Sequence, residues 1–279
     1  MPAVLGTNVA SLWASKNLQS AQANMADSVE RLSSGLRINR ARDDAAGLGI
    51  SNALTQQING ANQGIKNLND GISIVQTAEG AINAASEMAQ RIMVLATQGA
   101  NGTIVAGSTN STTIVNEMRV LMDSIDKIQS RTKFSGITLL NGAAITITSS
   151  NVASDTIVID ATALGLIGSS SNNSAATLSG QITTASTNYT LIQSYAATYI
   201  TTLDTQRGKL GALQNQMEYA VNNVTELSAN LSAARSRIMD TDYATETASL
   251  TKGQILQQAA TAMLAQANQM PNVILTLLK

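Results

Sequence analysis

Few side chains in this sequence could carry out acid–base, nucleophilic or metal chemistry. Its 279 residues include no His and no Cys. That composition removes the usual general base, the thiol nucleophile, disulfides and the ligands of common zinc sites. A Walker lysine motif is also missing from the sequence. We therefore expect a protein that is not an enzyme, with no catalytic residue, metal or cofactor.

Ion pairing is the chemistry that the densest charged segment offers. This charge cluster comprises Arg31, Arg37, Arg40, Arg42, Asp43 and Asp44. Exposed pairs of this kind contribute between 0 and about 1 kcal/mol each, so a solvated linker is the simplest interpretation. The whole chain has 17 basic and 18 acidic residues. Because this balance gives no broad basic field, we expect no nucleic-acid partner.

The elements that position these charges are predicted to be long helices. From Ile192 to Ile238, apolar residues recur in alternating steps of four and three, with Gln206 as the one polar member. A repeat kept this long is typical of a coiled-coil helix, whereas the stripe of an ordinary amphipathic helix should drift. A weaker repeat covers 54–96, and a shorter one covers 114–128 and ends near Arg131. The predicted core of these helices is Leu54, Ile58, Ile65, Leu68, Ile72, Leu203, Leu210, Leu213, Val224, Leu227 and Leu231.

The two ends of the chain carry narrower apolar seams. A helix is expected to start at Thr7 and Asn8 and to close at Gly35, and a second one reaches the carboxyl terminus, with a kink or early stop at Pro271. The predicted seam positions are Leu18, Met25, Leu32, Leu256, Met263, Met270 and Leu277. Trp13 is expected to fill the seam of this pair, the alternative being an anchor against neighbouring molecules. Because such a seam buries little, the ends should be completed by other copies of the chain.

A small β-hairpin is predicted near 143–160, where the segments ITIT at 145–148 and IVID at 157–160 flank a polar turn. Residues 165–174 have the composition of an exposed loop. The expected fold is therefore mainly α, with long coiled-coil helices from both chain ends and a small hairpin insert. We see neither a Sec signal peptide nor an uninterrupted stretch of 18 apolar residues, so we expect no membrane insertion.

Several motifs closely resemble the signatures of bacterial flagellins. Near the amino terminus they are RLSSGLRIN at Arg31–Asn39 and DDAAG at Asp43–Gly47, and NDGISIVQTAEG follows at Asn69–Gly80. Near the carboxyl terminus they are SAARSRI at Ser232–Ile238 and DYATE at Asp242–Glu246. The resemblance covers 1–141 and 203–279. Proteins of the hook–filament junction share this terminal plan more loosely and remain an alternative.

The resemblance implies a structural subunit that polymerises into the helical, extracellular flagellar filament for swimming motility. It implies an inner terminal coiled-coil domain from 1–43 and 238–279, a helical rod domain from 44–237, and no outer domains. Other implied partners are the flagellar type III export apparatus, a secretion chaperone at the carboxyl-terminal helix, and junction and cap proteins. Export would need no Sec signal. A membrane-active or receptor-binding secreted coiled coil, working as a monomer, is the competing class.

The resemblance also gives two residue sets a role. It places the charge cluster between the inner and rod layers, where Arg-to-Asp pairing between subunits competes with the solvated-linker interpretation. A second set matches the patch that the vertebrate Toll-like flagellin receptor recognises, namely Gln90, Arg91, Leu95 and Glu117. Met93 and Val94 stand where many receptor-active members have Arg and Glu, which predicts weaker recognition. Ordinary packing is the alternative for this set.

Overall fold

The computed structural model describes residues 8–105, 107–140, 142–150, 154–160, 173–183 and 188–277. The chain divides into two compact units, Met1–Gln56 with Asn230–Lys279, and Gln57–Ala229. Long helices make up most of the described chain, and its strands form two small antiparallel pairs. The predicted mainly α fold with a hairpin insert is confirmed. Within the part that the structure describes, none of the helices has the length and apolar character needed to span a membrane.

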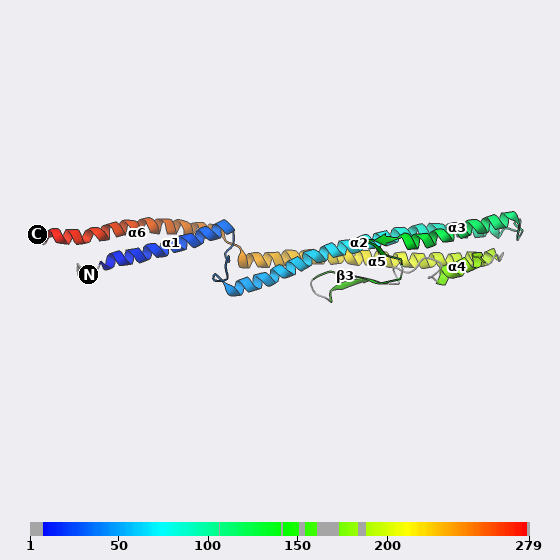
Figure 1. Ribbon diagram of the computed structural model, residues 1–279, viewed down its shortest axis with the longest axis horizontal. Helices are drawn as coiled ribbons and strands as arrows, with labels where there is room; N and C mark the ends of the chain where they lie inside the picture. Colours follow the sequence, from blue (N-terminus) through cyan, green and yellow to red (C-terminus); the bar gives the residue numbers. More distant parts are fainter. Residues whose placement is uncertain are drawn as a thin grey trace. The chain divides into compact units, whose positions relative to one another are not determined.

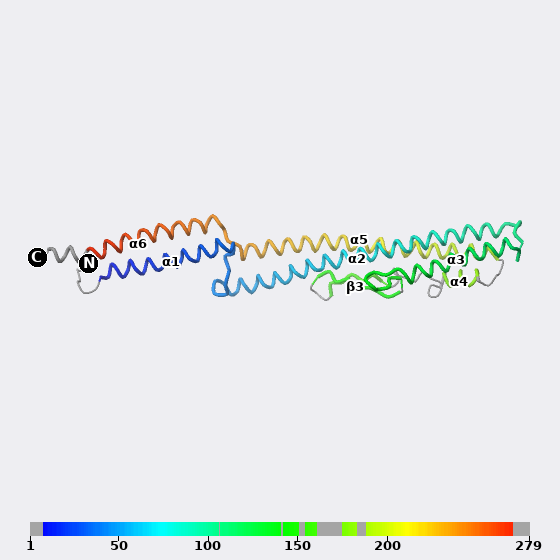
Figure 2. The backbone as a smooth tube through the Cα atoms, turned by 45° about the horizontal axis from the view of Figure 1, so that its top comes forward, coloured from blue at the N-terminus to red at the C-terminus, as the bar shows by residue number. Residues whose placement is uncertain are grey.

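The first unit contains two antiparallel helices, α1 (Val9–Ser34) and α6 (Tyr243–Leu277), which lie side by side in Figures 1 and 2. The side chain of Asn8 caps α1 by accepting a hydrogen bond from the backbone N–H of Ser11 (3.1 Å). Gly35 ends this helix with φ 71°, the left-handed conformation that favours glycine. Both predicted ends of α1 are therefore confirmed. The early stop considered at Pro271 does not occur, because α6 continues to Leu277.

The second unit is built around α2 (Ala45–Gly99), α3 (Thr109–Arg131) and α5 (Tyr189–Met239). Its buried core draws on all three helices, including Leu68, Ile82, Met118, Ile125 and Leu203. Gln206, the polar member of the predicted repeat, is also buried, and its side-chain oxygen has no hydrogen-bond partner in the structure. The four-and-three periodicity thus predicted these three helices correctly.

Two elements of the second unit were not predicted. The short helix α4 (Asn173–Thr183) packs against α3 and buries Ala175, Leu178 and Ile182. Strands β1 (Lys133–Phe134) and β2 (Ile137–Thr138) form a two-residue antiparallel pair after α3. Both elements are too short for their periodicity to stand out from the surrounding polar sequence. Most of the predicted loop at 165–174 lies outside the described residues.

The predicted hairpin consists of β3 (Ile145–Thr148) and β4 (Thr156–Ile159), with Ile145 opposite Ile159. Its apolar side chains Ile147 and Ile159 join the core of the second unit. The end of β3 lies against α2, where the amide of Asn67 donates to the carbonyl of Thr148 (3.1 Å). A Cβ atom at Gly64 would overlap the carbonyl group of Ser149, so this close approach depends on glycine.

Candidate assembly surface and charge cluster

The seam between α1 and α6 is narrow and is built largely from small residues. Its fully buried positions are Ala21 and Ser28 on α1, and Gly253 and Ala267 on α6. At one end, the amide of Asn8 donates to the carbonyl of Ala267 (2.8 Å) and so joins the two helices. A seam of this kind removes little apolar area from water and stabilises the pair weakly.

The predicted seam residues of the chain ends fall into two groups. Leu18, Met25 and Leu32 are half-buried on α1, whereas Leu256 and Met263 are exposed on α6. The buried or half-buried positions of α6 include Gly253, Ala260 and Ala267 instead. They lie three or four residues along the helix from Leu256 and Met263. The side chains of Met270 and Leu277 lie outside what the structure describes.

Trp13 does not fill the seam between α1 and α6, contrary to the sequence-based expectation. Its side chain is 61% exposed. It lies along a groove of about 630 Å³ that is lined by residues of α1 and α6, Leu256 and Met263 among them. The ammonium group of Lys16 lies 5.5 Å from the centre of the Trp13 ring, a cation–π contact. A single Trp in the sequence does not indicate whether its side chain packs between α1 and α6 or lies on their exposed surface.

Further large apolar side chains of α1 and α6 are exposed to solvent outside the groove. Exposed large apolar side chains on α1 and α6 are Val9, Leu12, Trp13, Val29, Tyr243, Ile255, Leu256 and Met263. Val9, Trp13, Leu256 and Met263 of this set line the groove together, and exposed apolar side chains gathered in this way mark a site of interaction. The arrangement provides a groove with small residues where a helix could approach closely, beside large side chains that could anchor it.

Ten of the eleven predicted core residues of the long helices are buried or half-buried. Ile58, Leu68, Leu203, Leu210 and Val224 are buried. Leu54, Ile65, Ile72, Leu213 and Leu231 are half-buried. Leu227 is 46% exposed and does not belong to the core of the isolated chain. Its neighbour Ser228 is half-buried instead, so at this turn the inward-facing position lies one residue away from the 3.5-residue repeat.

The charge cluster lies where the chain leaves α1 and enters α2, and the end of α5 packs against the same segment. The backbone N–H of Arg37 donates to the carbonyl of Met239 (2.6 Å), and that of Thr241 donates to the carbonyl of Gly35 (3.0 Å). Leu36 and Asp240 form an isolated antiparallel bridge. Ile38 is completely buried in this segment. These contacts make the crossover an ordered part of the first unit.

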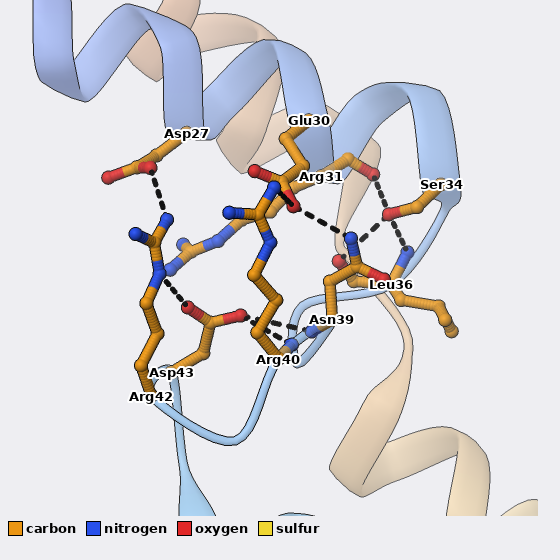
Figure 3. A network of polar contacts seen from close by, with 9 residues as sticks. All are labelled: Asp27, Glu30, Arg31, Ser34, Leu36, Asn39, Arg40, Arg42 and Asp43. Atoms are coloured by element: carbon orange, nitrogen blue, oxygen red, sulfur yellow. Dashed lines mark hydrogen bonds and ion pairs between the residues drawn. The ribbon is translucent and has the colours of Figure 1, made fainter.

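Charged groups of the cluster pair within the same chain, and Figure 3 shows the pairs made by Arg40 and Arg42. Arg40 pairs with Glu30 at 2.8 Å, and Arg42 lies 3.6 Å from Asp27 and 3.5 Å from Asp43. Arg31 lies 3.7 Å from Glu246 at the start of α6. The guanidinium group of Arg37 donates to the carbonyl of Ile238. The acidic partners on α1 and α6 were missed in the sequence because they are distant along the chain or belong to another helical turn.

The aspartates of this region cap turns and helices. Asp44 accepts a hydrogen bond from the backbone N–H of Gly47 (2.8 Å) at the start of α2. Asp242 does the same for α6, accepting from the hydroxyl of Thr245 (2.8 Å) and from the N–H of Ala244 (3.0 Å). These bonds, that of Thr245 above all, hold the pKa of Asp242 below its usual value. The N–H of Arg40 is the main cause that lowers the pKa of Asp43.

We predict that the stability of the chain is nearly constant between pH 5 and 8 and falls in acid. No His is present to titrate in that window. Asp43 and Asp242 have lowered pKa values in the folded state. Their stabilising contribution is therefore complete above the unfolded-state pKa of about 3.9 and is lost as the pH falls through the lower folded-state values. Thermal unfolding followed by circular dichroism from pH 2 to 8 measures this. A steep transition centred near pH 6.5 would contradict the prediction.

Three members of the receptor set lie together on the surface of the second unit. Gln90, Arg91 and Glu117 are exposed, and Arg91 donates to Glu117 through both Nε (3.0 Å) and Nη2 (2.7 Å). This pair joins α2 to α3. Leu95 is only 1% exposed and packs in the core, so it does not contribute to the same surface in the isolated chain.

Long helices with two small antiparallel strand pairs define the class of this chain, a mainly α protein. Residues 5–144 match the family model of the bacterial flagellin N-terminal helical region, and residues 192–278 match that of the C-terminal helical region. The chain therefore belongs to the bacterial flagellin family. The expected function, a structural subunit of the flagellar filament that serves motility, is likewise confirmed.

Individual relatives agree with the family match. The chain is 38% identical to a flagellin of Bacillus subtilis, with 98% of each chain covered. It is 36% identical to the flagellar filament 33 kDa core protein of Treponema phagedenis, with 99% of this chain and 100% of the relative covered. The crystal structure of Bacillus cereus flagellin aligns with 27% identity and a TM-score of 0.47, over 61% of this chain and 94% of that one.

Proposed function

We propose that this chain polymerises through the exposed apolar face of α1 and α6, and that a second copy of the same chain covers the groove beside Trp13. The carrying observation is this groove, with Leu256 and Met263 in its lining. A narrow seam of small residues leaves these large side chains in water within one molecule. Covering them is favourable by roughly 25 cal/mol per Å² of apolar area, which gives the assembly its driving force.

We further propose the predicted layering, with an inner layer from 1–43 and 238–279, a rod from 44–237, and no outer domains. The division of the chain into two compact units supports this proposal, because the first unit joins the two ends of the chain and the second is the continuous segment between them. The family membership supports a structural rather than a catalytic role, and we propose that the chain has no enzymatic activity.

Electron microscopy of the concentrated, purified chain tests the proposed function. Long tubes of regular diameter are expected, because each copy presents the same face and groove to its neighbours. Particles that remain monomeric at millimolar concentration, or irregular aggregates alone, would contradict the proposal and favour the monomeric secreted coiled coil.

For the charge cluster we propose that Arg31 also supports contacts between subunits. Replacing Arg31 with Ala removes its pairing with Glu246, which is partly exposed and contributes little within the chain. We therefore expect Arg31→Ala to slow polymerisation several-fold while the helical content and thermal unfolding of the monomer stay unchanged. Light scattering measures the rate and circular dichroism the fold. Unaltered polymerisation would leave the cluster as a solvated linker.

The remaining partners are proposed from family membership. They are the flagellar type III export apparatus, a secretion chaperone that holds the carboxyl-terminal helix, and the junction and cap proteins of the filament. Relatives in the family form the extracellular filament, and export without a Sec signal is the matching proposal for this chain. Pull-down of the full chain with each purified partner, compared with a variant lacking α6, tests the chaperone contact.

A receptor role is a second candidate function, favoured by the exposed Arg91–Glu117 pair beside Gln90. The candidate partner is the Toll-like flagellin receptor. Purified monomer added to receptor-reporter cells tests this role, with Arg91→Ala as the variant expected to lose the signal. Equal signals from the wild type and Arg91→Ala would show that the receptor does not recognise the surface around Arg91.

A further inference from the structure

The groove beside Trp13 contains an exposed thioether side chain, that of Met263. The side chain of Met263 is 65% exposed, more than that of any other methionine whose surroundings the structure describes. It lines the groove between α1 and α6 together with Trp13 and Leu256. With no Cys in the sequence, methionine is the only sulfur-containing residue of the chain.

Other methionines of the same chain are well shielded. Met118 and Met217 have no exposed surface, and Met122 is 3% exposed. Met93, on α2 in the second unit, is 39% exposed and does not line the groove. The chain therefore contains an exposed methionine inside the proposed assembly surface, one outside it, and buried ones for comparison.

We propose that Met263 is an oxidation site whose sulfoxide weakens polymerisation. The inference rests on the proposed function, because it assumes that the groove is covered by a second copy. A peroxide is the oxidant: a new S–O bond forms on the thioether sulfur as the O–O bond of hydrogen peroxide breaks. The sulfur loses two electrons, and the peroxide is reduced to water. The product is a polar sulfoxide in place of an apolar thioether.

The structure links this chemistry to assembly through burial. In a free chain the sulfoxide of Met263 would remain in water, so the fold should tolerate it. Under a second copy the same S=O group would lose its hydrogen bonds to water inside a groove that is largely apolar. We expect a rise of about tenfold in the critical concentration for polymerisation, equivalent to about 1.4 kcal/mol. The change is reversible, since reductases specific for each sulfoxide epimer restore methionine.

Peptide mass spectrometry after a timed exposure of the monomeric full chain to hydrogen peroxide tests the site. Met263 should be oxidised at least about tenfold faster than Met118 and Met217, because oxidation follows exposure. In chains already polymerised, Met263 should react several-fold more slowly than in the monomer. Equal rates at Met263 and the buried methionines, or no protection by polymerisation, would overturn the proposal.

Sedimentation of treated chains then tests the consequence. Oxidised wild-type chain should need about ten times more protein to polymerise, and Met263→Leu should be insensitive to peroxide. Met93→Leu, the matched control, should remain as sensitive as the wild type. If Met263→Leu were as sensitive as wild type, or if fully oxidised wild type polymerised normally, the oxidation proposal would be wrong while the assembly function stood. If untreated chain failed to polymerise, the proposed function itself would fail.

Discussion

Replacing Trp13 with Glu should raise the concentration needed for polymerisation by about 100-fold or more. Trp13 is a large exposed side chain at the groove, and tryptophans in such positions are frequent hot spots of protein interfaces. The change removes the anchor and places a carboxylate where a second copy must exclude water. Together these effects should exceed about 2.7 kcal/mol per subunit, which is a factor of 100. Sedimentation over a concentration series measures the effect.

Gln19→Glu is the matched control for Trp13→Glu. Gln19 is an exposed residue of the same helix that does not line the groove. The Gln19→Glu substitution adds the same negative charge to α1 as Trp13→Glu does, so a general effect of charge would appear in both variants. We expect Gln19→Glu to polymerise within about twofold of the wild type and both monomers to keep their helical content. Equal loss of polymerisation in the two variants would contradict the groove as the contact site.

Replacing Gly64 with Ala should lower the free energy of unfolding by about 3 kcal/mol, the range typical of forced backbone displacement. The added Cβ would overlap the carbonyl group of Ser149, which is backbone and cannot rotate away. The hairpin must therefore lift from α2 and lose the bond from Asn67 to Thr148 and the burial of Ile147. Urea unfolding of the monomer, followed by circular dichroism, measures the change.

Gly80→Ala is the control within the same helix. Gly80 is exposed, and a Cβ built there would meet no atom within 4 Å. Alanine favours the helix over glycine by about 0.8–1.0 kcal/mol, so this variant should be more stable than the wild type. Opposite signs at the two glycines would support the close approach of the hairpin. A stabilising Gly64→Ala would show that the hairpin does not rest on this position.

The helices were predictable because their signal is long. A repeat of four and three steps from Ile192 to Ile238 leaves little room for another structure, and α5 follows it from Tyr189 to Met239. The hairpin was predictable from two short segments rich in Ile, Val and Thr on either side of a polar turn. In contrast, α4 is short and carries no charge, and three of the side chains described in it are buried, so its pattern could not be distinguished from a loop.

The candidate surface was harder to predict than the fold. Periodicity identifies an apolar stripe but cannot divide it between a partner in the same chain and a partner in another. Leu18 and Met263 both lie in predicted seams, yet the first is half-buried and the second largely exposed. Trp13 was assigned to the wrong face for the same reason. The ion pairs of Arg40 with Glu30 and of Arg31 with Glu246 depend on the path of the chain between α1 and α2 and on the position of α6. No local sequence pattern predicts either of these.

Hydrogen exchange of the α1 and α6 amides, compared between the free chain and the polymer, tests the central claim most directly. The claim is that these helices are only partly stabilised within one molecule and are completed by neighbouring copies. We expect fast exchange across Val9–Ser34 and Tyr243–Leu277 in the monomer, slow exchange in the α2 and α5 core, and strong protection of all four helices after polymerisation. Equal protection of α1 and α6 in the monomer and the polymer would contradict it.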